Sequence, residues 1–473
     1  MGGKSIIDSV ASVGDKIGSQ SQDTDFIAKD EKYYAFLSNF NDLGKGNYEV
    51  VFEVAPKKWV DENVLETKKI SLGYLKSPAS TLVVPKISEN DLKKKLGIDP
   101  TKDLKNEWYE IELVQKLIDL KDVPVIQYPT RTKGGSKKPA ERKIKLRSSV
   151  ISKKSNKMKK KYRIEKTDRK IKGLVKGIKK KIGRVQPNAV AVLDVGQGNF
   201  NIIYDNNNHP MVYFDVGCGC HQHTQTAPPN VNKQIPAPDV IILSHWDEDH
   251  WEIADTQNNN HLKNVDWVVP EQTVGPVTHN FYQDIQPYPR VIRYNHSLTR
   301  DEITFELIKC TGTNMNNSGV ALVTSYPGSA DDYVLLPGDA QFRYFTSIHW
   351  ESFLFINAPH HGSNAHLAQN DIPFPRRIWR QDPNDPFTFN IIQQQGKMAF
   401  SYGMWHDVWG NHYAYNHPSP IAITRYNNRY WTIRRGTQEN VPRNGTIARA
   451  NIMLGNAPPG FNGIYYTANI RNI

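Results

Sequence analysis

The sequence predicts an α/β protein of the α+β type, in which a small mixed N-terminal domain and a basic linker precede a larger domain of strands and helices. Three observations support this. The chain has 473 residues, too many for one ordinary core. Basic side chains are concentrated in one stretch. Short apolar runs separated by turn residues begin after Pro187. We therefore divide the chain into residues 1–130, 131–186 and 187–473.

The composition indicates a folded protein with no membrane partner. Hydrophobic residues make up 38% of the chain and aromatic residues 10%, which excludes wholesale disorder. The sequence has no apolar run of about eighteen residues, and its first residues lack the apolar stretch of a secretory signal. Three cysteines form an odd and sparse set that favours a reducing compartment. We therefore expect a cytoplasmic location.

The first 130 residues are expected to form a recognition or regulatory module, because nothing in them has catalytic spacing. Residues 48–55 alternate between apolar and polar, as in a half-buried strand. Ser88 and Asp91 resemble a capping box that opens a short helix. Apolar residues recur at helical spacing between residues 108 and 118, which predicts a second helix that ends before Pro124.

The stretch from Arg131 to Arg184 carries most of the positive charge. It holds 24 Lys and Arg residues against three acids, so its charge is +21, whereas the whole chain is +12 and the remainder about −9. One interpretation is a phosphate-binding arm in which Lys159, Lys160 and Lys161 contact nucleic acid. The alternatives are a solvated linker or strap across the acidic remainder, and a protease-sensitive regulatory hinge.

The third region has the pattern of a domain with two sheets flanked by helices, because many strands alternate with helix-length spacers. The predicted strands begin near residues 189, 200, 211, 240, 265, 304, 320, 333 and 430.

The strongest chemical signal lies directly after the strand near residue 240. Four side chains that can bind a metal ion occur within six residues: His245, Asp247, Asp249 and His250. Such crowded acids and imidazoles would repel and desolvate one another unless cations neutralised them. Two later strands also end in possible ligands, Asp339 in one case and His360 with His361 in the other. The sequence therefore predicts a metal site at the strand ends.

These motifs resemble those of the metallo-β-lactamase superfamily, and most closely the hydrolase domain of ComEC-type competence proteins, which act in DNA uptake. The resemblance covers about 250 residues. It rests on Leu193–Gly198, Phe214–Gly217, the His245 cluster, Asn316–Ser318, Gly338–Asp339, His360–Ser363 and Asn416–Pro418.

The resemblance implies a four-layer αββα sandwich with two divalent metal ions at one edge of its sheets. It implies that His245 and Asp247 bind the first metal and that Asp249 and His250 bind the second. Asp339 would bridge the two ions, and one member of the pair His360 and His361 would complete the second site.

Three positions depart from the family pattern. Asp247 stands where the superfamily has a second histidine, and the segment around Asn317 stands where an intermediate histidine ligand is usual. Asn199 replaces the aspartate that follows the opening motif. More oxygen and less imidazole shift the preference from zinc towards manganese or magnesium, with zinc still open.

The segment from Cys218 to His223 holds two cysteines and two histidines and invites a separate zinc-site hypothesis. Its spacing is not that of a zinc knuckle, and no partner pair follows nearby. We favour a loop beside the active site, with an accessory ligand as the alternative.

The resemblance implies a metal-dependent nuclease or phosphodiesterase that uses water activated by two metals. Asp249 or Asp339 would orient that water, and His417 would protonate the leaving oxygen or bind phosphate, unless it is a structural residue before Pro418. Asn317 and Ser363 are candidate substrate contacts. The alternatives are a hydrolase of small esters, lactones or thioesters and a non-catalytic binding protein on the same fold. A regulated defence effector or toxin, with a protein partner or protease acting on residues 1–186, is a further expectation.

Overall fold

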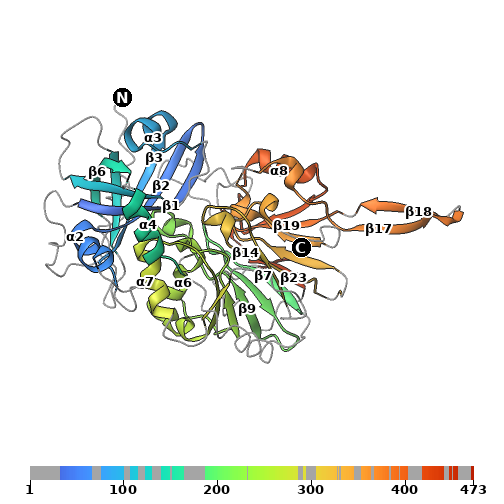
Figure 1. Ribbon diagram of the computed structural model, residues 1–473. Coiled ribbons are helices and arrows are strands. Elements are labelled where there is room, and N and C mark those ends of the chain that lie inside the picture. Colours follow the sequence, from blue (N-terminus) through green and yellow to red (C-terminus); the bar gives the residue numbers. More distant parts are fainter. Residues whose placement is uncertain are drawn as a thin grey trace. The chain divides into compact units, whose positions relative to one another are not determined.

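The computed structural model describes residues 32–66, 76–100, 107–114, 123–129, 140–149, 152–164, 187–228, 230–231, 233–285, 291–294, 305–327, 329, 332–345, 353–363, 367–382, 385–393, 395–402, 418–440, 447–449, 451–455 and 470–472 (Figure 1). The chain forms two compact units. Unit 1 contains the described residues up to Tyr162 together with Gly275–Val277, and unit 2 contains the other described residues from Arg163 onward.

Unit 1 contains a closed barrel of six antiparallel strands in the order β1-β2-β3-β5-β6-β4, in which β4 pairs back with β1. The strands are β1 (Lys32–Gly44), β2 (Asn47–Pro56), β3 (Ser80–Ser88), β4 (Trp108–Val114), β5 (Val123–Pro129) and β6 (Ala140–Ser149). Alternate side chains point into the barrel because successive residues of a strand face opposite sides. The core therefore takes Val50, Phe52 and Val54 from β2.

The predicted strand at residues 48–55 is confirmed as part of β2, but the predicted helix between residues 108 and 118 is wrong, because Trp108–Val114 is strand β4. A second set of apolar residues, Tyr109, Ile111 and Leu113, recurs with period two in the same segment, and these three side chains lie in the barrel core. Aromatic and β-branched residues favour the strand, and pairing with β1 and β6 decides between the two periods.

Helices α2 (Lys57–Val60), α3 (Glu89–Leu96) and α4 (Ser152–Lys161) accompany the barrel, and a π-helical turn (Asp61–Leu65) follows α2. The predicted cap of α3 is confirmed, since the Ser88 side chain accepts a hydrogen bond from the Asp91 backbone N–H at 3.1 Å. The helix ends at Gly97, whose φ of 62° suits glycine.

Much of the predicted basic linker belongs to unit 1. Strand β6 completes the barrel, and α4 follows it with Met158 and Tyr162 buried. Lys154 anchors α4 by donating a hydrogen bond to the Tyr34 hydroxyl at 3.1 Å. The N-terminal part of unit 1 thus extends past residue 130 to Tyr162. The basic segment has few apolar residues of its own, but pairing with neighbouring strands satisfies the backbone N–H and C=O groups of β6. Residues 131–139 and 165–186 lie outside the described part of the chain.

Unit 2 contains two large mixed sheets, as the strand pattern predicts. The first has the order β12 (Val291–Tyr294), β11 (Asp266–Pro270), β10 (Val240–Ile242), β9 (Pro210–Phe214), β8 (Asn201–Tyr204), β7 (Ala189–Val192), β23 (Asn451–Gly455) and β24 (Ile470–Asn472). The second has the order β13 (Glu306–Lys309), β14 (Val320–Ser325), β15 (Tyr333–Leu336), β16 (Phe353–Asn357), β19 (Lys397–Phe400) and β20 (Ile433–Gly436).

The two sheets share one hydrophobic core. Side chains of the first sheet, such as Ile203 and Val240, belong to the same buried cluster as Leu322 and Leu336 of the second. The other face of the second sheet forms a separate cluster with helix α8 (Pro420–Asn427). Helices α6 (Glu252–Asp255) and α7 (Pro276–Ile285) also accompany this unit, and Phe281 of α7 contacts Trp267 of β11 with ring centroids 5.8 Å apart.

Short elements complete the described part of unit 2. Strands β17 (Arg377–Asp382) and β18 (Asp385–Gln393) form a hairpin, as do β21 (Gln438–Asn440) and β22 (Ile447–Arg449). The segments of 3-10 helix include η3 (His221–Thr226), η4 (Glu248–His250), η5 (Gln257–Asn264), η6 (Asn316–Ser318), η7 (Phe342–Tyr344), η9 (Pro359–Gly362) and η10 (Gln369–Asp371). No helix among the described residues is both long and apolar enough for a membrane span.

Candidate metal centre

The candidate ligands follow the carboxyl ends of strands in the two sheets of unit 2. Strands β9 and β10 are parallel, and so are β15 and β16, so within each pair the strand ends meet at one edge. The loop after β10 carries His245 to His250, β15 is followed by Asp339, and β16 is followed by His360 and His361. Segments far apart in the sequence therefore come together.

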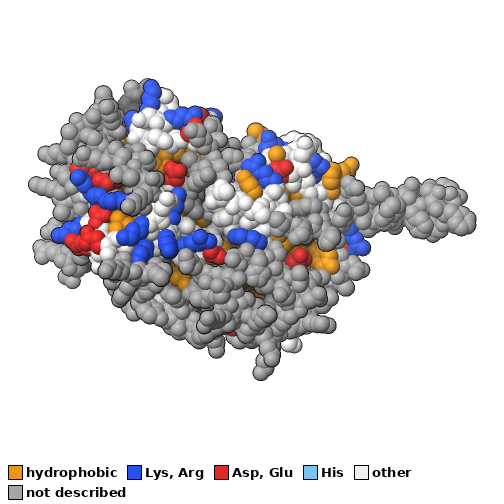
Figure 2. Space-filling view, viewed as in Figure 1, with side chains coloured by type: hydrophobic (Ala, Val, Ile, Leu, Met, Phe, Trp, Pro, Cys, Tyr) orange, Lys and Arg blue, Asp and Glu red, His pale blue; other side chains and the backbone are white. Residues whose placement is uncertain are grey.

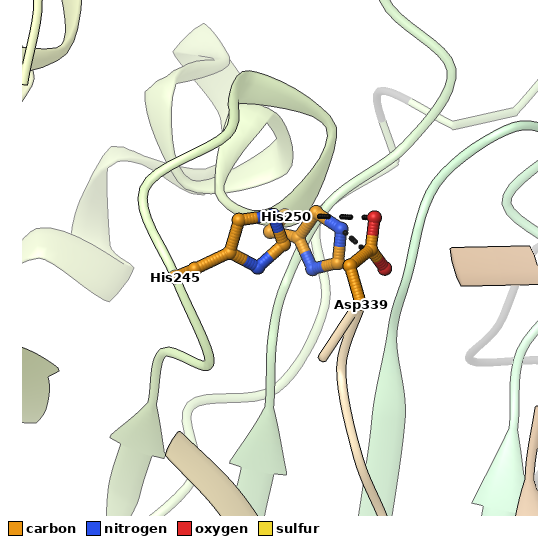
Figure 3. Close-up of side chains that lie close together, drawn as sticks. All are labelled: His245, His250 and Asp339. Atoms are coloured by element: carbon orange, nitrogen blue, oxygen red, sulfur yellow. Dashed lines mark ion pairs between the residues drawn. The ribbon is translucent and has the colours of Figure 1, made fainter. Parts of the chain in front are cut away.

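Asp339 lies among three imidazoles. Its Oδ1 is 3.3 Å from Nε2 of His250, and its Oδ2 is 4.0 Å from Nε2 of His245 and 3.8 Å from Nε2 of His360. Figure 3 shows His245 and His250 of the loop after β10 close to Asp339, which follows β15. Because its two oxygens face different histidines, Asp339 has the arrangement of a carboxylate that can bridge two cations.

Asp247 and Asp249 of the loop after β10 also lie beside histidines. Oδ2 of Asp247 is 3.2 Å from Nε2 of His245. Oδ2 of Asp249 is 3.5 Å from Nε2 of His361, and its Oδ1 is 3.9 Å from Nε2 of His250. Among the described residues, two groups of ligand atoms are compact enough to hold a metal ion, one of His245, His250 and Asp339 and the other of Asp249, His250 and His361.

Hydrogen bonds to the far side of the rings determine which nitrogen of each histidine faces the centre. Nδ1 of His361 donates to the backbone carbonyl of Ser401 at 2.7 Å, and Nδ1 of His250 lies 2.8 Å from Oδ2 of Asp215. The Ser244 hydroxyl donates to the same Asp215 oxygen at 2.9 Å and lies 3.0 Å from Nδ1 of His245. A neutral ring with a proton on Nδ1 presents the Nε2 lone pair to the carboxylates.

Several buried atoms at the centre have no hydrogen-bond partner within the described part of the chain. They are Nε2 of His250, Nε2 of His361 and Oδ1 of Asp247. Buried polar atoms without a partner are costly, and nitrogen lone pairs facing carboxylate oxygens add repulsion. The residues fit a pair of divalent cations, because such ions accept this mixture of imidazole nitrogen and carboxylate oxygen.

The pKa values reflect the same opposition between groups. Burial acts to lower the pKa of His250 and of His361, but the surrounding carboxylates, including Asp339 and Asp249, raise both. Burial acts to raise the pKa of Asp339 and of Asp249, but the histidines lower both. Without another cation, the site holds protons on its imidazoles to balance its carboxylates.

Two of the seven candidate ligands are partly exposed. Asp249 and His360 keep 15% and 19% of their side-chain exposure, whereas the other five candidate ligands keep at most 4%. Solvent therefore reaches the centre at Asp249 and His360, which form its open side.

The backbone is strained where the ligands are held. His360 and His361 have φ values of 47° and 56°, in the left-handed region that side chains other than glycine rarely adopt. Asp215, which holds His250, has a φ of 60°. Such strain persists only where surrounding contacts impose it, and it is concentrated at functional sites.

Glycine is required where the loops approach each other. A Cβ on Gly217 would lie 1.7 Å from the backbone oxygen of Asp249, and one on Gly319 would lie 2.1 Å from that of Ser244. The backbone N–H of Val216 donates to the His250 carbonyl at 2.8 Å, which fastens the strand end of β9 to the ligand loop.

The structure brings together all seven predicted metal ligands, but the other predicted site residues are placed differently. The Asn317 side chain accepts a hydrogen bond from the Gln341 backbone N–H at 2.9 Å and thus holds the chain after Asp339. Ser363 is buried, and its backbone N–H donates to the His360 carbonyl at 2.9 Å. Lys160 is exposed, Lys159 is half-buried, and Lys161 is buried, all on α4 of unit 1. His417 lies outside the described residues.

Sequence reasoning missed the residues that hold the ligands in place, namely Asp215, Ser244, Ser401 and Asn199. Asp215 had a usable signal, because it directly follows a strand and lies in the motif Phe214–Gly217. Ser401 had none, because it holds His361 through its backbone oxygen.

The cysteine-containing loop takes no part in either group of ligand atoms among the described residues. Cys218 is buried, and burial raises the pKa of the Cys220 thiol well above its usual value. His221 instead lies 3.0 Å from Glu248 of the ligand loop. This agrees with a loop beside the centre.

Comparison with known proteins gives no family assignment. The chain matches no protein-family model and no curated protein.

Proposed function

We propose that unit 2 is a metallo-β-lactamase-type hydrolase, which binds two divalent metal ions and hydrolyses phosphodiester bonds in nucleic acid. One observation carries this proposal: Nε2 of His250 and Nε2 of His361 are buried, face the carboxylates of Asp339 and Asp249, and have no hydrogen-bond partner among the described residues. A binding protein that had only kept the fold would have no use for so costly an arrangement.

The architecture of unit 2 supports the fold part of this proposal. Two mixed sheets share a core, α8 packs on the outer face of the second sheet, and α7 contacts β11 of the first. A four-layer αββα sandwich with its site at one edge of the sheets has this arrangement, and the motifs occur in the order that the resemblance implies.

The contacts divide the ligands between two positions. Asp247, His245 and His360 lie on the side of Asp339 Oδ2, and Asp249, His250 and His361 lie on the side of its Oδ1. We therefore assign His361 to the second metal, with His360 beside the first. A mixture of imidazoles and carboxylates at both positions suits zinc or manganese, and magnesium less well.

In the proposed reaction, two divalent ions held by these residues would supply an activated water and would neutralise charge on the phosphate. The chain itself provides orientation and exclusion of solvent. Asp249 is the partly exposed carboxylate and is placed to orient the attacking water at the open side. Buried Asp339 holds the histidines apart, and Asp215 fixes His250 through Nδ1. His417 remains the proposed proton donor to the leaving oxygen.

The choice of nucleic acid as substrate rests on charge. The segment from Arg131 to Arg184 carries +21, and Lys157 and Lys160 of α4 are exposed. Figure 2 shows Lys and Arg side chains over the region of α4 and α2, interspersed with acids. A hydrolase of small esters or lactones would leave this charge without a role. Regulation through residues 1–186, as in a bacterial defence effector, belongs to the same proposal.

The test is incubation of the purified chain with plasmid DNA, single-stranded DNA and RNA, each with manganese, magnesium or zinc. We expect metal-dependent cleavage that Asp339→Ala abolishes. Asp239→Ala is the matched control, because it removes a surface carboxylate 3.3 Å from His209 and leaves the centre intact. Cleavage that survives in Asp339→Ala, or cleavage only of an ester and lactone panel, would overturn the nuclease proposal. Elemental analysis that finds no metal would overturn the metal centre.

A further inference from the structure

Three asparagine side chains form a buried cluster behind the candidate metal centre. They are Asn199, in the loop before β8, Asn201, at the start of β8, and Asn357, at the end of β16. All three are buried, with at most 3% exposure. The cluster thus links the first sheet to the second at the edge where the ligands lie.

Asn199 is the member of the cluster that contacts Asp215. Its Oδ1 accepts hydrogen bonds from Nδ2 of Asn201 at 2.9 Å and from Nδ2 of Asn357 at 3.3 Å. Its Nδ2 donates to Oδ2 of Asp215 at 2.8 Å. One amide therefore joins the second sheet to the carboxylate that holds His250.

The backbone of Asn199 is attached to the ligand loop as well. Its N–H donates to the Asp249 carbonyl at 3.1 Å, and its carbonyl accepts from the Gly217 N–H at 2.9 Å. A shift of Asn199 would thus reach two ligands, Asp249 through the backbone and His250 through Asp215.

The contacts require a neutral side chain that both donates and accepts. Oδ2 of Asp215 already receives the Ser244 hydroxyl and Nδ1 of His250, and Asn199 supplies a third donor. A carboxylate at position 199 would place a second negative oxygen against Asp215 in a buried site, where like charges cannot both be stabilised.

We propose that Asn199 is a positioning residue of the metal centre. Its neutral amide fixes the orientation of Asp215 and hence of His250, and through Asn357 it joins β16, whose following loop carries His360 and His361. This inference rests on the proposed metal centre. The positioning role explains why this chain has an amide at position 199, where the metallo-β-lactamase pattern that it resembles has an aspartate.

The test compares Asn199→Asp and Asn199→Ala with the unaltered chain in binding of Co²⁺ and Mn²⁺. We expect metal affinity to fall by about tenfold or more, as for other residues that orient metal ligands. We also expect the visible absorption spectrum of bound Co²⁺ to change, because that spectrum reports the geometry of the ligands. Asn199→Ser keeps a small neutral donor and acceptor, so it should retain more metal affinity than Asn199→Asp or Asn199→Ala. It also provides the comparison if those two variants do not fold.

Asn259→Ala is the matched control. Asn259 is equally buried and makes three side-chain hydrogen bonds, to the Ile235 N–H, the Lys233 carbonyl and the Thr256 hydroxyl. It should lose thermal stability but keep the Co²⁺ spectrum and affinity. If the unaltered chain binds two metals and the Asn199 variants match it in spectrum and affinity, the positioning role is refuted while the metal centre stands. If the unaltered chain binds no metal, the proposed function itself fails.

Discussion

Nδ1 of His361 lies 2.7 Å from the backbone carbonyl oxygen of Ser401. A carbonyl only accepts, so the ring proton is on Nδ1, and Nε2 faces Oδ2 of Asp249 at 3.5 Å. A second proton or a metal ion on Nε2 would relieve the repulsion between the nitrogen lone pair and the carboxylate. Proton and metal therefore compete for the same place on His361, and the same competition applies to His250.

This competition predicts opposite pH dependence for the metal-free and metal-bound protein. The pKa values of His250 and His361 are raised in the folded state, so their stabilisation is complete below about pH 6.5 and is lost as pH rises through the folded values. The melting temperature in a chelator should fall from about pH 6.5 upward. With Mn²⁺ the increment in melting temperature should grow over the same range, because metal binding displaces the protons.

The measurement is thermal unfolding between about pH 6 and pH 9, with chelator or with Mn²⁺, for the unaltered chain and for His361→Gln. The variant should show a weaker fall in chelator. A melting temperature that is identical in both proteins at every pH would contradict the assignment.

Asp215→Asn should weaken metal binding without removing any ligand. Asp215 accepts from the Ser244 N–H, the Ser244 hydroxyl, Asn199 and His250, and an amide would turn a donor toward some of these donors. We expect metal affinity to fall by about 10- to 100-fold. Isothermal titration with Mn²⁺ measures this, with Asp239→Asn as the surface control; equal affinities would show that Asp215 does not orient His250.

Gly217→Ala should displace the ligand loop. Its Cβ would lie 1.7 Å from the Asp249 backbone oxygen, so one of the two segments must move. We expect loss of metal from the Asp249 side. Gly97→Ala is the control, because its φ of 62° makes the change cost about 1 kcal/mol in unfolding free energy while no atom lies within 4 Å. Metal stoichiometry checks the result, and two ions bound in Gly217→Ala would refute it.

Reversing charge on α4 should weaken nucleic-acid binding for every sequence alike. Lys157 and Lys160 are both exposed, and removal of one lysine–phosphate interaction makes the salt dependence of binding shallower by about one unit of slope. The double variant Lys157→Glu with Lys160→Glu should therefore bind more weakly and with a shallower slope. Lys45→Glu with Lys86→Glu makes the same charge change on exposed positions of unit 1. Nucleic-acid binding is titrated at several salt concentrations for both double variants and the unaltered chain. Equal slopes of affinity against salt in the α4 variant and the unaltered chain would argue against a phosphate-binding role for α4.

The local pattern of apolar residues predicts secondary structure well where it has a single period. It predicts poorly where the helical and the strand period are both present. The alternating residues of β2 and the cap of α3 are predictable, because each depends on neighbours within a few positions. The pattern of β4 predicts a helix because its apolar residues satisfy both periods over a short distance. The basic stretch has the composition of a linker, and the sequence does not reveal strand β6 in it. The strand forms by pairing with β4 and β5, and this pairing does not show in the local pattern of residues.

The sequence alone determined the identity of the seven ligand candidates, since acids and imidazoles crowded at strand ends have few other physical uses. It also determined the strand-rich character of unit 2, because strand alternation is a local property. Only the tertiary structure decided how the ligands divide around Asp339, which nitrogen of each histidine faces the centre, and that Asp215, Ser401 and Asn199 hold them. These relations depend on contacts between residues far apart in the chain, and backbone atoms such as the Ser401 carbonyl carry no signature in the sequence.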